Sequence, residues 1–141
     1  MGYTHYWQAA DISKTAWQTV CADMAKLFAA TPKGLLVKEY DEPKSKPYCG
    51  PDHLQFNGRG DAGHETFWIN RVESGMSGTF GFCKTAHKPY DSAVVAALIY
   101  LAKHCAYSVS SDGDAADWQD GLALARKAWP DEPLSIPEFQ E

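Results

Sequence analysis

The chain has 141 residues, of which 45% are hydrophobic and 22% are charged, and its formal net charge is −5. This length fits one domain with a substantial core, and the composition excludes a chain that is disordered throughout. The acidic balance argues against a generally basic protein, so duplex nucleic acid is not an expected partner. No apolar run could span a membrane and the N-terminus lacks the pattern of a secretion signal, so we expect a cytoplasmic protein.

Hydrophobic periodicity and turn residues predict the element order α-β-β-β-β-α-β-α. The predicted elements are a helix at 12–30, strands at 35–40, 53–57, 66–72 and 79–84, a helix at 91–105, a strand at 106–110 and a helix at 114–129. Asp11 or Ser13 would cap the first helix, and Asp91 the second. A turn at 73–78 would join two of the strands.

This order predicts an α+β (mixed α/β) fold in a single globular domain over residues 1–129. We expect a single sheet of about five mostly antiparallel strands, with one β-α-β unit, packed with three helices. Residues 130–141 are acidic and contain several prolines, which is typical of a loosely held tail.

Alternation along the strands assigns side chains to faces of the sheet. One face of the strand at 79–84 carries Phe80, Phe82 and Lys84, and the phenylalanines are expected in the core. On the preceding strand, Glu65 and Arg71 share a face with two apolar residues that are expected in the core. Glu65 and Lys84 would then both lie at the rim of the core face, where they could pair across the strands. His64 would then point to the opposite face.

The β-α-β unit formed by 79–84, 91–105 and 106–110 predicts where a site lies. Its two strands would run parallel through a right-handed crossover, with both carboxyl ends at one edge of the sheet. Open α/β sheets bind ligands at such an edge. Three polar segments would converge there: 63–66, 84–91 and 110–114.

The segment 84–91 favours an anion because it carries lysines just before a helix N-terminus, where backbone N–H groups and the helix dipole attract negative charge. The residues expected to bind an anionic ligand are Lys84, Thr85, Lys88, Tyr90, Arg71, His64, Glu65 and Ser110. The opposing interpretation is a solvated loop whose lysines pair with Glu65 and Asp91.

Asp112 and Asp114 form an acidic group with Asp117 where a helix is predicted to begin. Such oxygens suit a divalent cation, and Asp112 and Asp114 are the candidate metal ligands. The spacing of a calcium loop is missing, however, and acidic residues also favour helix N-termini by capping alone. Apart from such a cation, no cofactor is expected.

The cysteines and histidines show no recognised metal or redox spacing. Cys21, Cys49, Cys83 and Cys105 include no C-x-x-C pair, so we expect reduced thiols, with Cys21 and Cys105 acting as small apolar residues. Among the five histidines, His5 and His64 are the two that merit testing.

Four short segments carry a resemblance to a known family. They are Tyr3-Thr4-His5-Tyr6, Gly63-His64-Glu65-Thr66-Phe67, Phe82-Cys83-Lys84-Thr85-Ala86-His87-Lys88-Pro89-Tyr90-Asp91, and Ser110-Ser111-Asp112-Gly113-Asp114 with Asp117-Trp118. Together they resemble an uncharacterised family of small proteins from tailed phages and prophages. The resemblance implies an infected bacterial cytoplasm as the setting, and it implies no chemistry.

We therefore expect a non-enzymatic phage protein that binds an anionic ligand, such as a nucleotide or signalling nucleotide, and counters a host defence. One alternative is a protein–protein inhibitor of a host factor that uses the aromatic N-terminus and the acidic tail. Another is a small metal-dependent phosphoesterase, with His64 or Glu65 as acid or base. The sequence leaves the oligomeric state open, a homo-oligomer included.

Overall fold

The computed structural model describes residues 2–72 and 79–139, and it combines three α-helices with seven strands in two antiparallel sheets. In chain order the elements are β1 (Thr4–Gln8), α1 (Lys14–Ala30), β2 (Leu36–Val37), β3 (Tyr48–Cys49), β4 (His53–Gly58), a 3-10 turn η1 (Gly60–Ala62), β5 (Phe67–Asn70), β6 (Phe80–Lys84), α2 (Asp91–His104), β7 (Ser108–Ser111) and α3 (Gln119–Ala128). The α+β class is therefore confirmed. The turn expected at 73–78 lies outside the described residues.

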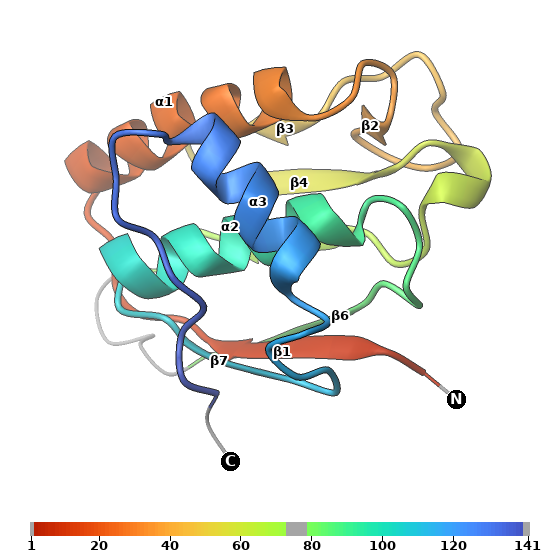
Figure 1. Cartoon of the computed structure of the whole chain (residues 1–141). Coiled ribbons are helices and arrows are strands. Elements are labelled where there is room, and N and C mark those ends of the chain that lie inside the picture. Colours follow the sequence, from red (N-terminus) through yellow and green to blue (C-terminus); the bar gives the residue numbers. More distant parts are fainter. Residues whose placement is uncertain (1, 73–78, 140–141) are drawn as a thin grey trace.

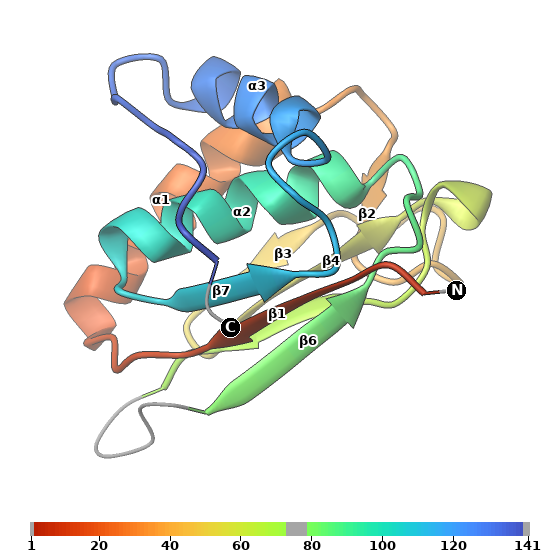
Figure 2. The ribbon, with the colours of Figure 1, turned by 60° about the horizontal axis from the view of Figure 1, so that its bottom comes forward.

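The first sheet has the strand order β6-β1-β7, and the helices lie on one side of it (Figure 1). β1 is antiparallel to both neighbours, so β6 and β7 run parallel to each other and α2 connects them. This confirms the predicted β-α-β unit. The difference is that the N-terminal strand, which the periodicity did not predict, lies between its two strands (Figure 2).

The second sheet is built on β4, which pairs antiparallel with β2, β3 and β5. The expectation of a single sheet of about five strands is therefore wrong. β5 and β6 approach each other at one end, where the Glu65 N–H donates to the Lys84 carbonyl at 3.2 Å. Farther along they enclose a hollow of about 260 Å³, lined in part by Trp7, Trp68 and Phe80.

The core lies between the sheets and the helices, with α2 at its centre. Nine consecutive residues of α2, Ala93–Leu101, are buried, as expected for a helix that is apolar on nearly every face. α1 begins after Ser13, whose Oγ accepts the Ala16 N–H at 3.1 Å, so Ser13 rather than Asp11 caps the helix. In the described part of the chain, no helix has both the length and the apolar surface that crossing a bilayer requires.

The two phenylalanines of β6 lie on the opposite face from the one expected. Phe80 and Phe82 are 59% and 57% exposed, whereas Cys83 is buried. The inward positions are Gly81 and Cys83, and the Trp7 indole lies against Gly81 so closely that a side chain there would collide with it. Alternation correctly grouped Phe80 with Phe82, but it could not tell which face the helices cover.

Two predicted helix starts also differ from the structure. The third helix begins at Gln119 rather than at 114, because residues 115–118 form a turn. The second helix does begin near Asp91, but Tyr90 occupies the capping position and makes no side-chain capping bond. The Asp91 carboxylate is directed instead toward β1.

The C-terminal segment packs on the domain, although the sequence suggested a loosely held tail. Leu134 is buried, and the Phe139 ring lies 4.8 Å from the Trp118 ring, centroid to centroid. The Arg126 guanidinium donates to the Leu134 carbonyl at 3.1 Å. The apolar residues of this segment therefore close the core beside α3.

Replacing Phe82 by Ala tests the orientation of β6. We expect a change in the free energy of unfolding within about 0.5 kcal/mol, because the ring is mostly exposed. The matched control Phe67→Ala, in which the lost ring is fully buried, should cost about 3–5 kcal/mol. Urea unfolding followed by circular dichroism measures both, and equal losses would contradict this orientation of β6.

Candidate functional site

The three polar segments expected at one sheet edge do lie together, and β1 joins them. The Tyr90 hydroxyl donates to the Glu65 carbonyl at 2.5 Å, which connects the segment before β5 to the start of α2. Asp112 lies beside Thr4, whose backbone N–H donates to Asp112 Oδ2 at 3.1 Å while its carbonyl accepts the Asp112 N–H at 2.9 Å. The N-terminal strand thus lies between segments that were expected to be direct neighbours in space.

A buried polar network runs through the centre of this edge. His5 is 0% exposed, and its Nε2 lies 2.7 Å from Asp91 Oδ1 while its Nδ1 lies 2.8 Å from Ser111 Oγ. Asp91 Oδ1 also accepts the Thr85 hydroxyl at 2.5 Å. Residues from β1, β7 and α2 are therefore tied together by side-chain hydrogen bonds, and the chain of groups runs Ser111–His5–Asp91.

These three residue types are those of a nucleophilic triad, but their surroundings favour a structural role. Ser111 Oγ already accepts the Gly113 N–H at 2.9 Å and the Trp118 indole N–H at 3.2 Å. The rings of Tyr3 and Trp118 stand edge-on to the His5 ring, at 5.0 and 5.3 Å between centroids. Both ring nitrogens are engaged and no His5 surface is exposed, so a substrate has no contact with the imidazole.

In the segment expected to bind an anion, several polar groups already form hydrogen bonds within the protein. Thr85 and Tyr90 are fully buried and their hydroxyls donate to Asp91 and Glu65. The backbone N–H groups of Thr85 and Ala86 both donate to the Tyr3 carbonyl, at 3.1 and 3.2 Å. These donors are therefore already hydrogen-bonded to protein acceptors, and the nearby Asp91 carboxylate would repel an anion.

The shape of this segment depends on two consecutive left-handed residues. Ala86 and His87 have φ values of 54° and 58°, a conformation that costs non-glycine residues free energy. The Tyr3 ring stacks on the His87 ring, with 3.5 Å between centroids and 19° between planes. That stacking, together with the two hydrogen bonds to the Tyr3 carbonyl, holds the strained turn against β1.

The remaining predicted ligand residues are divided among separate places. His64, Glu65 and Lys88 line a pocket of about 500 Å³ together with Tyr40 and Asp61. This pocket mixes one lysine with two carboxylates, which does not favour an anion. Glu65 uses its carboxylate to accept the Lys84 backbone N–H at 2.7 Å, so it contacts the Lys84 backbone across the strands.

Arg71 and Ser110 lie away from that pocket. The Arg71 guanidinium donates to the Ile12 carbonyl at 3.1 Å, just before α1. Ser110 is paired opposite Tyr6 in the β1–β7 ladder, on the same sheet face as Phe82, because directly paired residues share a face. The structure therefore brings His64, Glu65 and Lys88 together and leaves Arg71 and Ser110 apart from them.

The two candidate metal ligands have different hydrogen-bond partners. The Asp112 carboxylate accepts from Thr4 and from the Tyr6 hydroxyl, both at 3.1 Å. Asp114 Oδ1 accepts the Asp117 N–H and Asp117 Oδ2 accepts the Asp114 N–H, a reciprocal pair that stabilises the turn before α3. Over residues 2–72 and 79–139, no three metal-binding side chains gather in one place.

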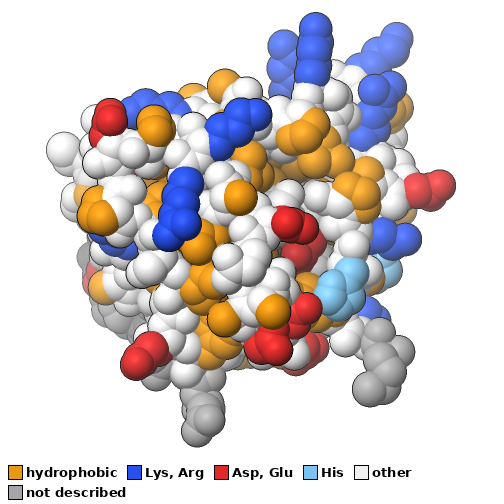
Figure 3. All heavy atoms as spheres, viewed as in Figure 1, with side chains coloured by type: hydrophobic (Ala, Val, Ile, Leu, Met, Phe, Trp, Pro, Cys, Tyr) orange, Lys and Arg blue, Asp and Glu red, His pale blue; other side chains and the backbone are white. Residues whose placement is uncertain are grey.

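A strongly basic pocket, which the sequence reasoning missed, is formed by a different set of residues. It measures about 610 Å³ and lies between the end of α1, the loop that follows it and the loop before β3. Its four charged lining residues are all basic: Lys33, Lys44, Lys46 and Arg59. Figure 3 shows Lys and Arg side chains gathered at the upper right, in the region where Figure 1 places β2. All four lie in turns or loops outside the predicted helices and strands, where periodicity carries no signal.

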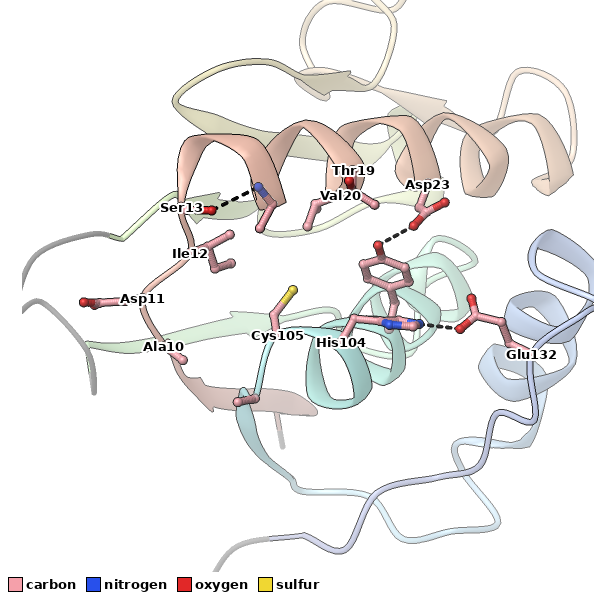
Figure 4. Close-up of a pocket in the computed structure, with 13 residues that line it drawn as sticks. Ala10, Asp11, Ile12, Ser13, Thr19, Val20, Asp23, His104, Cys105 and Glu132 are labelled. Atoms are coloured by element: carbon pink, nitrogen blue, oxygen red, sulfur yellow. Dashed lines mark hydrogen bonds and ion pairs between the residues drawn. The ribbon is translucent and has the colours of Figure 1, made fainter.

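A third pocket, of about 760 Å³, has the opposite charge (Figure 4). It lies beside the first half of α1 and contains Asp11, Asp23 and Glu132. The Tyr100 hydroxyl donates to Asp23 at 2.5 Å, and burial together with that carboxylate raises the pKa of Tyr100. His104 Nε2 lies 2.5 Å from Glu132. The carboxylates of Asp23 and Glu132 therefore join α1, α2 and the C-terminal segment.

Comparison with known proteins adds no relative: no family model, no curated protein and no solved structure matches this chain.

Removing the Asp91 carboxylate tests the buried network. Asp91→Ala leaves the buried His5 ring and the Thr85 hydroxyl without their shared acceptor, so we expect the free energy of unfolding to fall by about 1–3 kcal/mol. The control Asp61→Ala removes an exposed carboxylate and should change it by less than about 0.5 kcal/mol. If urea denaturation gives both variants the same stability, the network does not stabilise the fold.

Proposed function

We propose that this protein binds a small anionic ligand of nucleotide size, and that the binding site is the basic pocket formed by Lys33, Lys44, Lys46 and Arg59. The observation that carries the proposal is the charge of the lining: four cations and no carboxylate around one pocket of about 610 Å³. Among the described residues, none of these four has an acidic partner within ion-pair distance.

The rest of the lining supports a ligand with an apolar part as well as a charge. Phe28, Leu36 and Val37 contribute to the wall, and pockets for small organic ligands are commonly apolar with a few well-placed polar groups. A nucleotide has this division, since its base is flat and poorly charged while its phosphates are anionic. Phosphate oxygens are good acceptors for lysine and arginine.

Hydrogen bonds within the protein order the loops that carry the basic residues. Ser45 Oγ accepts the Lys38 N–H at 3.0 Å and donates to the Glu42 carbonyl at 2.6 Å. The Arg59 N–H donates to the Leu35 carbonyl at 2.8 Å, which joins the end of β4 to the start of β2. Backbone that is already ordered lowers the entropy lost when a ligand binds.

The family resemblance suggests a biological setting for this activity. In the cytoplasm of an infected bacterium, a phage protein that holds a nucleotide without turning it over would withdraw a host signal. The protein is then a binding module rather than an enzyme, and a host nucleotide is its partner.

Calorimetric titration with ATP tests the function, and adenosine serves as the uncharged control. We expect ATP to bind and adenosine to bind much more weakly, with the ATP affinity falling as salt is raised. The double variant Lys44→Ala/Lys46→Ala should raise the Kd about 10-fold or more, because each lysine removed takes away a charge-assisted contact with phosphate.

The double variant Lys84→Ala/Lys88→Ala provides the matched control, since it removes two lysines from the segment expected from the sequence. Its affinity should equal that of the unaltered protein. If Lys84→Ala/Lys88→Ala weakens binding and Lys44→Ala/Lys46→Ala does not, the basic pocket is the wrong site. If neither ATP nor pyrophosphate binds at all, the proposed function is wrong.

A further inference from the structure

Two cysteines that are 28 positions apart in the sequence meet where α1 crosses β3. Their sulfur atoms lie 2.6 Å apart, one from the first half of α1 and the other from the second residue of β3. Both residues are half-buried thiols. A disulfide bond is about 2.05 Å long, so Cys21 and Cys49 need to move by only about half an ångström to bond.

The backbone around the two sulfurs is fixed by hydrogen bonds. The Trp17 indole N–H donates to the Gly50 carbonyl at 2.6 Å, and Cys21 Sγ lies 3.5 Å from the same oxygen. Trp17 and Cys21 are one helical turn apart, so one face of α1 is docked on the residue after Cys49. On the other side, the Gly50 N–H donates to the His53 carbonyl at 3.0 Å, which completes the turn between β3 and β4.

The pair is also open to a small reagent. Cys21 and Cys49 line a pocket of about 470 Å³ with Trp17 and Gly50. Lys14, Asp52 and Arg71 line the same pocket, so two of its three charged groups are basic. The other two cysteines are placed differently: Cys83 is fully buried beside Tyr90, and Cys105 lines the acidic pocket.

We propose that Cys21 and Cys49 form an intramolecular disulfide when the protein meets a low-molecular-weight disulfide such as oxidised glutathione. This inference is independent of the proposed nucleotide binding. It assigns a covalent modification to two cysteines that are expected from the sequence to be reduced thiols.

The reaction proceeds by two thiol–disulfide exchanges. The Cys21 thiolate attacks one sulfur of glutathione disulfide, so a Cys21–glutathione bond forms, the glutathione S–S bond breaks and one glutathione thiolate leaves. Cys49 then attacks the Cys21 sulfur, forms the Cys21–Cys49 bond and expels the second glutathione thiolate. The two cysteines lose two electrons and two protons, and the two released glutathiones take them up as thiols.

The order of the two steps follows from the surroundings of the sulfurs. Burial, and then the adjacent Cys21 sulfur, raise the pKa of Cys49, so that thiol stays protonated and is the poorer first nucleophile. In the second step the departing glutathione thiolate can receive the Cys49 proton. Burial likewise raises the pKa of Cys83 to about 12 and that of Cys105 to about 11, which leaves both slow to react.

The bond would close a loop that carries most of the basic pocket. The chain between the two cysteines contains Lys33, Lys44 and Lys46, and its two ends would be joined at the crossing of α1 and β3. Closing this loop restricts the unfolded chain as well as the folded one.

The experiment treats the folded, reduced protein with oxidised glutathione, stops exchange with acid, and maps the products by mass spectrometry without reduction. We expect a product that has lost two hydrogens and carries no glutathione, with the peptides of Cys21 and Cys49 joined. Retention of all four thiols, a bridge between other cysteines, or a bridge between two chains would each overturn the proposal.

Three variants make the result specific. Cys49→Ser should stop after the first step and accumulate glutathione on Cys21, whereas Cys21→Ser should form no bridge and little adduct. Cys105→Ser, the matched control, should form the bridge as the unaltered protein does. If Cys49→Ser takes up no glutathione on Cys21 while remaining folded by circular dichroism, the proposed sequence of steps is wrong.

Discussion

The whole arrangement depends on one constraint of backbone pairing. The α2 crossover places β6 and β7 parallel, one strand apart, and each needs a partner for its inner row of N–H and C=O groups. β1 fills that gap and is antiparallel to both. Because side chains alternate along β1, Tyr3, His5 and Trp7 all point into the protein, where they are buried. The interior of the β6-β1-β7 sheet, including the polar network around His5, therefore follows from where this strand lies.

Much of the fold could be predicted from the sequence because helical periodicity is a strong signal. The apolar stripe of α1, the continuously apolar middle of α2 and the β-α-β unit around it all appear in the structure. β1 was missed because its buried row contains the polar His5 while its less buried row contains the aromatic Tyr6, so hydrophobicity does not alternate along the strand. The face of β6 was assigned wrongly for a related reason. Period-two alternation gives two sets of residues, but only tertiary packing decides which set meets the helices.

The candidate site was predictable only in part, and the reason is physical. Chain topology correctly brought the segments at 63–66, 84–91 and 110–114 together, because strand direction fixes which ends meet. It could not show that Thr85 and Tyr90 would turn their hydroxyls inward to satisfy Asp91 and Glu65. Nor could it find the basic pocket, whose lysines come from irregular loops that only the paired strands β2, β3 and β4 bring face to face. The net charge of −5 concealed this pocket, since it is a sum over the whole surface.

The position of β1 also has a consequence for how the chain folds. His5 and Ser111 are in contact although 106 positions separate them, so the central strand of this sheet emerges from the ribosome long before its outer strands. Until β6 and β7 have been synthesised, a segment rich in aromatic residues has no strand to pair with. Contacts between residues so far apart form slowly, because a long loop must close before they contribute. The sheet is therefore completed late, and until then the newly made β1 is open to pairing with other chains.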